Sequence, residues 1–205
     1  MSDALELYGE KKQTQPLRSA PAKAFTYKDY ISWGDSARWE LLDGTPHMMA
    51  APTAWHQRVS GKLFRQLDEF LDGKPCEAFI APFDVRLRPE DDDSDIVVVQ
   101  PDVLVICDNA KLSGGKACKG APDFIIEVIS DGTRGKDFGE KRVLYEKAGV
   151  REYWIVDTNR ICKYVLLDGM YRETACRLDA DLVLEVGALP GCSIRFREIA
   201  GLALP

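Results

Sequence analysis

Three segments in the middle of the chain are almost continuously apolar, and they constrain the fold more than any other feature. They are residues 96–107, 124–129 and 152–157. Strands that alternate polar and apolar residues bury one face, whereas continuous apolar strands are typical of a sheet covered on both faces. The sequence therefore predicts an α/β chain with a mixed central sheet and helices packed against it.

Helical signals lie on both sides of these strands. Apolar residues keep helical spacing over residues 53–71. A second helix is expected over residues 138–148, capped by Asp137 and ended by Gly149. A further strand is expected over residues 79–87. From the first helix to the last of these strands, the predicted order is α-β-β-β-α-β.

Shorter elements are expected at both ends of this core. Thr26 can cap a short helix, Asp43-Gly44 indicates a hairpin, and Asp168-Gly169 indicates another hairpin after the core. Residues 1–24 have no periodicity, which predicts a flexible tail. Residues 25–205 are then expected to form a single domain.

The cysteines and the apolar runs bear on the compartment. No run approaches the roughly 20 apolar residues of a membrane helix, and the polar N-terminus has no secretory apolar region. Six cysteines are present, none within four residues of another, so they form no zinc knuckle. All six are expected to be thiols in a reducing cytoplasm, with no membrane partner.

The charge is unevenly distributed. The formal net charge of −6 is not typical of a general polyanion binder, because nucleic-acid affinity comes largely from neutralising phosphates. Residues 111–151, however, carry nine basic and six acidic side chains. They can form a local basic patch, although a solvated face explains the same charges equally well.

Two carboxylates interrupt the apolar strands, Asp102 in the first and Glu127 in the second. A buried ionised carboxylate is costly unless it is paired or bound to a metal. Neighbouring strands lie about 4.8 Å apart, so two carboxylates on one side can share a hard cation such as Mg²⁺ or Mn²⁺. Considered singly, each carboxylate is better explained as a side chain at the end of a strand that is hydrogen-bonded to a loop. Asp123 lies roughly 13 Å from Glu127 along a strand and is too far away to share the ion.

Lys141 lies near the centre of the apolar stripe of the second predicted helix. A lysine there extends its stem to reach water, pairs with an acid or serves a site. Taken with the two carboxylates, the third role is favoured.

These residues belong to a wider pattern. It comprises Gln100-Pro101-Asp102, Gly120-Ala121-Pro122-Asp123, Glu127-Val128-Ile129-Ser130, Asp137, Lys141, Tyr145 and residues 149–157, together with residues 39–44, Pro52-Thr53, His56-Gln57 and residues 83–87. The pattern resembles the bacterial restriction endonuclease-like family of the PD-(D/E)XK nuclease superfamily, from about residue 25 to residue 173. The resemblance implies an αβββαβ core with an added N-terminal helix and hairpin and C-terminal hairpins.

The resemblance also implies roles. Asp102 corresponds to the aspartate of the Pro-Asp motif and Glu127 to the acidic residue of (D/E)XK. Ile129 stands at the lysine position, and Lys141 stands where related families move that lysine. Glu40 resembles an additional upstream acid, while His56 and Asp84 match positions without an assigned role. For His56, near a helix start, a structural role is at least as well supported.

The implied activity is hydrolysis of phosphodiester bonds in nucleic acid, with DNA favoured. Asp102, Glu127 and the backbone carbonyl of Val128 would hold Mg²⁺ or Mn²⁺, and Lys141 would orient water or stabilise the transition state. The basic residues expected to contact the nucleic-acid backbone are Lys111, Lys116, Lys119, Arg134 and Lys136. Two active sites cut both strands of a duplex most easily, which favours a homodimer.

Two other functions stay open. The isoleucine at position 129 and the acidic net charge fit a nuclease-fold module that binds nucleic acid or assembles without catalysis. Carboxylates with a metal also fit an enzyme that acts on a small phosphoester.

Overall fold

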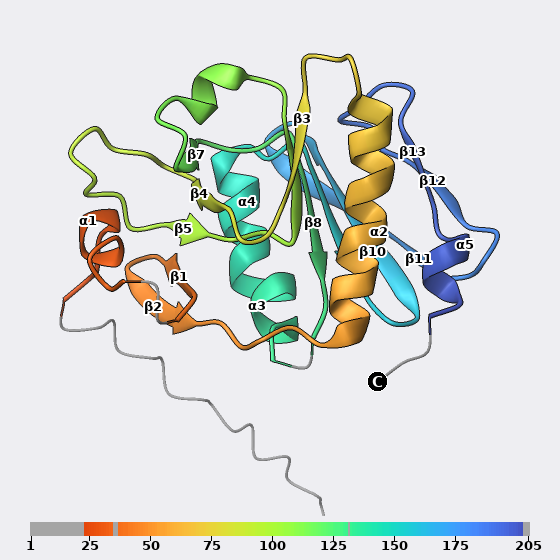
Figure 1. The fold of residues 1–205 in the computed structure, drawn as a ribbon, viewed down its shortest axis with the longest axis horizontal. Helices are drawn as coiled ribbons and strands as arrows, with labels where there is room; N and C mark the ends of the chain where they lie inside the picture. The colour runs from red at the N-terminus through yellow and green to blue at the C-terminus, as the bar shows by residue number, and fades with distance from the viewer. Residues whose placement is uncertain (1–22, 35–36, 131, 203–205) are drawn as a thin grey trace, which may run out of the picture.

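The computed structural model describes residues 23–34, 37–130 and 132–202 (Figure 1). It confirms the α/β class with mixed sheets. The tail predicted for residues 1–24 lies outside the described residues, except for its last two. Within the described ranges, no helix combines the length and the apolar character needed to cross a membrane.

A six-stranded sheet forms the centre of the molecule. Its strands, in spatial order, are β11 (Met170–Arg177), β10 (Arg160–Leu167), β9 (Glu152–Val156), β8 (Phe124–Val128), β6 (Val103–Ile106) and β3 (Glu77–Ile80). Strands β8 and β9 are parallel, and the other neighbours are antiparallel. Helix α2 (Ala54–Leu71) precedes β3 in the chain, and α4 (Arg142–Ala148) connects β8 to β9.

A five-stranded sheet lies beside the central one. Its strands, in spatial order, are β2 (Thr45–Met48), β1 (Trp39–Leu42), β5 (Val98–Val99), β4 (Asp84–Arg86) and β7 (Ala117–Lys119). The single strands expected over residues 79–87 and 96–107 are therefore wrong, since each divides between the two sheets. Each break contains a proline, Pro82 or Pro101, which has no N–H to donate to a ladder.

The remaining elements are short. They are α1 (Tyr27–Tyr30), the 3₁₀-helix η1 (Asn109–Leu112), α3 (Arg134–Lys136), the π-helix η2 (Asp137–Lys141), β12 (Val183–Glu185), β13 (Ser193–Arg195) and α5 (Arg197–Ala200). The Thr26 cap and the left-handed Gly149 after α4 are confirmed. Segments α3, η2 and α4 run consecutively, so Asp137 lies inside this helical stretch, and the prediction that it caps a helix is wrong.

The central sheet is buried on both faces, as its apolar strands predict. Alternate residues pack toward α2 and toward α4. The first set includes Val103, Val105, Ile126, Val128 and Trp154, and the second includes Leu104, Ile125, Tyr153 and Ile155. In Figure 1, α2 lies to the right of β8 and in front of β10, and α4 lies to the left of β8.

The prediction that all six cysteines are thiols is wrong for one pair. Cys76 and Cys107 form a disulfide across 31 residues, with 3.9 Å between their Cα atoms. Glu77 of β3 lies opposite Ile106 of β6, so these cysteines form the next antiparallel pair. Pairing between distant strands brings them together, which sequence spacing does not reveal.

Candidate active site

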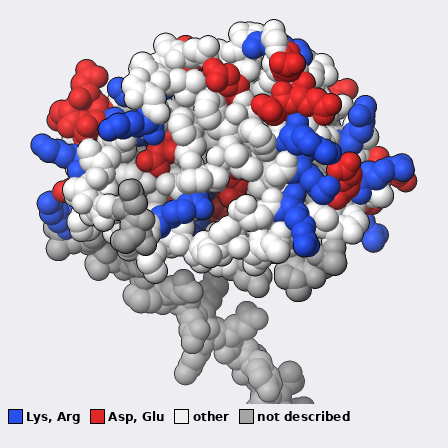
Figure 2. Space-filling model, in the orientation of Figure 1, with Lys and Arg blue, Asp and Glu red and all other residues white. Residues whose placement is uncertain are grey.

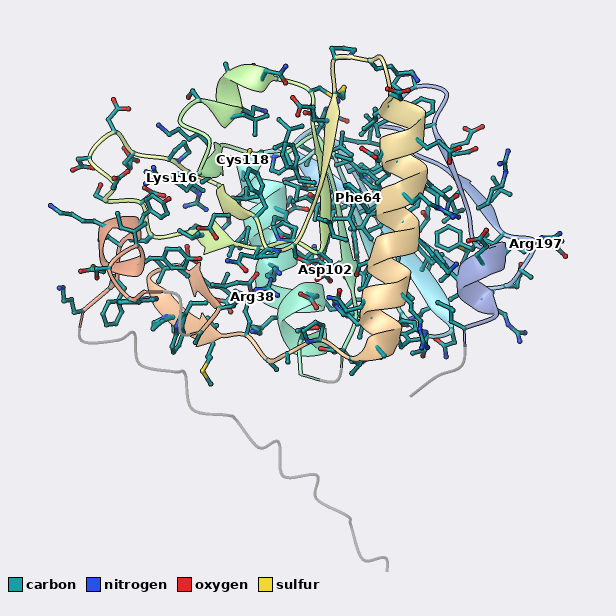
Figure 3. The ribbon with its side chains drawn as sticks, viewed as in Figure 1. Arg38, Phe64, Asp102, Lys116, Cys118 and Arg197 are labelled. Carbon is teal, nitrogen blue, oxygen red and sulfur yellow. A yellow bond between two sulfur atoms is a disulfide. The ribbon has the colours of Figure 1, made fainter. Side chains whose placement is uncertain are left out.

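A pocket of about 340 Å³ opens between the β1–β2 hairpin, the first turns of α2 and the α3–η2 segment. Its charged and imidazole lining comes from Arg38, Glu40, His56, Asp102, Glu127, Lys136, Asp137 and Lys141. Figure 2 shows a basic and an acidic group side by side low on the visible face, where Figure 3 labels Arg38 and Asp102. Residues from distant parts of the sequence thus meet in one pocket.

The register of β6 and β8 places Asp102 beside Glu127. Val103 lies opposite Ile126, so Asp102 and Glu127 are the next residues along and face the same side. Glu127 Oε2 lies 3.4 Å from the backbone N of Asp102. The backbone N–H of Val128 donates to Asp102 Oδ2 at 2.8 Å. Both predicted ligand side chains therefore stand at the same end of the sheet.

Lys141 reaches these carboxylates from the helical side. Its Nζ lies 2.5 Å from Glu127 Oε1, 2.8 Å from Glu40 Oε1 and 3.7 Å from Asp137 Oδ1. Lys141 ends the π-helical segment η2, in which both Asp137 and Lys141 turn inward and are buried. Single π-helical turns are frequent at functional sites because they re-aim side chains. Ile129 packs in the apolar core with Leu144.

Burial and mutual charge shape the titration of this cluster. Burial alone would lower the pKa of Lys141, but Glu127, Glu40 and Asp137 outweigh it and hold that pKa well above its ordinary value. Burial raises the pKa of Glu127 well above its ordinary value, and the attraction of Lys141 offsets only part of the rise. Burial likewise raises the pKa of Asp137. Three carboxylates thus surround one buried ammonium.

Two further side chains hold the carboxylates in place. The hydroxyl of Tyr145 donates to Glu127 Oε1 at 2.7 Å, and His56 Nε2 lies 3.0 Å from Asp102 Oδ2. The backbone N–H of Gln100 donates to Glu40 Oε1 at 3.0 Å. Tyr145 and Asp137 were not among the site residues predicted from the sequence. Each lies four residues from Lys141, and this spacing could have indicated that they share its side of the helix.

The donor set fits a divalent cation. Asp102 Oδ1 receives no hydrogen bond from the described residues, and Glu127 Oε2 receives only the 3.4 Å contact from Asp102. Carboxylate oxygens in a site with excess negative charge suit a hard ion. Within the described ranges, no three His, Cys, Asp or Glu side chains are already arranged as a metal site. The fit therefore rests on the two carboxylates and on Val128 beside them.

The five basic candidates do not gather at the pocket. Lys136 lines it, and Arg134 forms a two-pronged ion pair with Asp157 at 2.8 and 2.9 Å. The remaining three lie on or next to η1 and β7 and are absent from the described pocket lining: Lys111, Lys116 and Lys119. Figure 3 labels Lys116 well away from Asp102. Only part of the expected basic surface therefore borders the site.

Two other acidic residues lie outside the pocket lining. Asp84 accepts hydrogen bonds from Tyr30 and from Gln100, both at 2.8 Å, and burial raises its pKa. Asp123 precedes β8, accepts the backbone N–H of Cys107 and pairs with Arg151 at 2.9 Å. Asp123 therefore has a structural place, as its distance from Glu127 predicts.

Comparisons with known proteins agree with the family resemblance. Residues 27–197 match a family model described as "Uma2: Putative restriction endonuclease". The chain is similar to the crystal structure of a putative nuclease belonging to DUF820 from Anabaena variabilis ATCC 29413, with 12% sequence identity and a TM-score of 0.68. That match covers 86% of this chain and 97% of the other and shows a shared fold. No curated protein matches the chain significantly.

Proposed function

This chain belongs to the Uma2 family of restriction endonuclease-like proteins, and on that premise we propose that it is a metal-dependent endonuclease that hydrolyses phosphodiester bonds in nucleic acid. One observation carries the proposal: the buried ammonium of Lys141 lies 2.5 Å from Glu127, and Glu127 faces Asp102 across the sheet. Two acidic oxygen donors beside a fixed cation are the groups that this hydrolysis needs.

Each side chain has a part in this proposal. Asp102 and Glu127 would hold Mg²⁺ or Mn²⁺, with the carbonyl of Val128 as a further ligand. When bound, such an ion makes water more acidic and neutralises charge on the phosphate. Because its neighbours raise its pKa, Lys141 keeps its proton and stabilises negative charge rather than accepting a proton. Glu40 fixes that ammonium, and Tyr145 fixes Glu127.

The proposal extends to substrate and assembly. DNA is the favoured substrate, and a homodimer would present two sites to the two strands of a duplex. The proposed location is the cytoplasm.

Cleavage assays test the activity directly. Duplex DNA, single-stranded DNA and RNA are incubated with the protein and Mg²⁺ or Mn²⁺, with Glu127→Gln as the matched inactive variant. We expect metal-dependent cleavage of at least one substrate by the wild type alone. No cleavage of any of them would contradict the proposal. A crystal soaked in manganese should hold an ion between Asp102 and Glu127.

A second candidate is a non-catalytic module on the same fold. It is favoured by the three carboxylates that already engage Lys141, since a purely structural ion-pair cluster would look the same. Nucleic-acid binding that depends on salt but is indifferent to Mg²⁺ and to Glu127→Ala would select this candidate. Turnover of small phosphodiesters without nucleic-acid cleavage would select the small-substrate enzyme instead.

A further inference from the structure

Three buried polar atoms in the described residues have no hydrogen-bond partner, and all three belong to side chains of the same pocket. They are Arg38 Nη2, His56 Nδ1 and Ser60 Oγ. His56 is 9% exposed and Ser60 is 2% exposed. An unsatisfied buried polar group is costly and therefore rare in native proteins. Their concentration here indicates that the pocket is built to receive a polar ligand.

The three atoms come from two walls of the pocket. His56 and Ser60 are four residues apart on α2 and therefore share one face of that helix. Arg38 comes from the segment before β1, where its backbone carbonyl accepts the N–H of Met49 at 2.8 Å. Figure 1 shows α2 and the β1–β2 hairpin as separate elements joined by the chain that runs along the lower edge. A ligand between them would meet donors from both walls.

The Arg38 guanidinium is held in one orientation. Its Nε donates to Gln100 Oε1 at 2.9 Å. The other end of the same amide donates to Asp84 Oδ1 at 2.8 Å and to the hydroxyl oxygen of Tyr30 at 3.1 Å. A side-chain amide accepts at its oxygen and donates at its nitrogen, so Gln100 can join Arg38 to Asp84. These hydrogen bonds give Asp84 a role: Asp84 anchors Gln100, and Gln100 orients Arg38.

The charge balance distinguishes Arg38 from Lys141. Lys141 is engaged by three carboxylates, whereas Arg38 has no ion-pair partner among the described residues. Guanidinium has only donors, in a planar fork that matches phosphate oxygens. Arg38 therefore provides, together with Lys136 of the same lining, positive charge that remains available to an anion in this pocket.

We propose that Arg38 forms an anion subsite of the pocket, which takes a backbone phosphate of the nucleic acid next to the bond that is cleaved. Gln100 and Asp84 are positioning residues that act through Arg38. The identification of the anion as a nucleic-acid phosphate rests on the proposed function. The inference that an anion binds here rests on the guanidinium of Arg38, which has no ion-pair partner among the described residues.

The first experiment measures DNA binding by Arg38→Gln. Anisotropy of a short labelled DNA is recorded in Ca²⁺ at several salt concentrations, and gels verify that the DNA stays intact. We expect the Kd to rise about tenfold or more and the slope of log Kd against log salt to fall by about one. The matched control is Arg172→Gln, an exposed arginine of β11 outside the pocket lining, which should change neither quantity.

The second experiment tests the positioning role. Gln100→Met should raise the Kd in the presence of Arg38 but add nothing to Arg38→Gln, because it acts through that residue. Independent, additive effects would overturn the positioning role. Arg38→Lys keeps the positive charge but loses the planar, two-pronged guanidinium. The slope of log Kd against log salt should therefore equal that of the wild type, while the Kd for DNA still rises. Thermal unfolding of each variant verifies that it is folded.

Inorganic phosphate separates this inference from the proposed function. Its binding to the metal-free protein is measured by ³¹P NMR line width. In one outcome, the wild type binds phosphate, Arg38→Gln does not, and the wild type neither binds nor cleaves nucleic acid. This outcome would support the anion subsite and contradict the endonuclease. The opposite result is also possible to detect: the wild type cleaves nucleic acid with metal, but Arg38→Gln changes neither DNA binding nor phosphate binding. This result would support the endonuclease and overturn the subsite.

Discussion

Two buried glutamates on adjacent parallel strands have very different surroundings. Glu152 begins β9 and is fully buried. Its Oε1 accepts Trp154 Nε1 at 2.6 Å and pairs with Lys163 at 2.9 Å, and its Oε2 accepts the backbone N–H of Ala188 at 2.8 Å. Every oxygen of Glu152 therefore has a donor from the protein.

Glu127, near the end of β8, is equally buried but incompletely satisfied. Tyr145 and Lys141 engage its Oε1, whereas its Oε2 has only the 3.4 Å contact from the Asp102 backbone. Glu127 also lines a pocket with three other carboxylates, and Glu152 does not. Burial of a carboxylate is thus no sign of function by itself. An oxygen left open toward a pocket with excess negative charge is the informative feature.

The largest expected effect comes from removing the charge of Glu127. Glu127→Gln should lower the cleavage rate by about 1,000-fold or more and abolish Mn²⁺ binding, because an amide is a poor ligand for a hard cation. Its folding stability should be unchanged or higher, because Glu40 and Asp137 remain to pair with Lys141 and one of several buried carboxylates is lost. Cleavage assays and calorimetric titration with Mn²⁺ measure both effects. Unchanged Mn²⁺ affinity would make Glu127 as structural as Glu152.

Lys141→Met should lower the cleavage rate by about 100-fold, the scale expected when a donor to the transition state is removed. Methionine keeps most of the stem volume and the helix propensity, which alone would leave stability unchanged. The three ion pairs change that expectation: their loss leaves buried carboxylates uncompensated, at a cost of about 3 kcal/mol. Cleavage kinetics and urea unfolding test the two effects separately. Wild-type cleavage in this variant would favour the non-catalytic module.

Glu152→Gln should act on folding alone. The amide nitrogen would face one of the donors that now bind Glu152, leaving it unsatisfied, so stability should fall by about 2 kcal/mol. Mn²⁺ affinity and the cleavage rate of the folded protein should stay at wild-type values. Urea unfolding and calorimetry measure these quantities. A loss of metal affinity in this variant would erase the contrast between the two glutamates.

The sequence predicts what depends on local periodicity. The apolar strands at residues 124–129 and 152–157, the helix over residues 54–71 and the turns at Asp43-Gly44 and Asp168-Gly169 follow from short-range patterns, and the structure contains them. The inward direction of Lys141 follows from helical spacing. The placement of Asp102 beside Glu127 needs one further assumption, that their strands are neighbours, which the β6–β8 register bears out.

Features that depend on distant pairing could not be predicted in this way. The division of two apolar segments between sheets depends on which partner each half finds. Gln100, which orients Arg38, lies 62 residues further along the chain, and the sequence does not reveal that these two residues meet. Tyr145 and Asp137 each lie four residues from Lys141, so their spacing indicates that they share its side of the helix. The π-helical turn that carries Asp137 and Lys141 departs from ordinary helical spacing and could not be predicted in this way.

The smallest expected effect is a change in how stability depends on pH. Burial raises the pKa of Glu127 well above its model-compound value of 4.5. Below that pH, the folded and unfolded states are both protonated at this group, and its contribution to stability is complete. As the pH rises, the unfolded state ionises first, so this contribution is lost progressively until the folded-state pKa has been passed. Asp137, whose pKa is also raised, acts in the same direction.

Metal-free wild type should therefore lose stability as the pH rises through the range above about 5, relative to Glu127→Gln, which lacks the titrating group. Glu152→Gln should keep the wild-type slope, because its substitution leaves the pocket carboxylates in place. Mn²⁺ binds the ionised carboxylates, so it should stabilise the wild type more at the upper end of this range. Urea unfolding in EDTA and in Mn²⁺ measures the three slopes. A wild type and a Glu127→Gln variant with equal slopes would show that Glu127 does not titrate in this window, and the proposed contrast with Glu152 would lose its electrostatic basis.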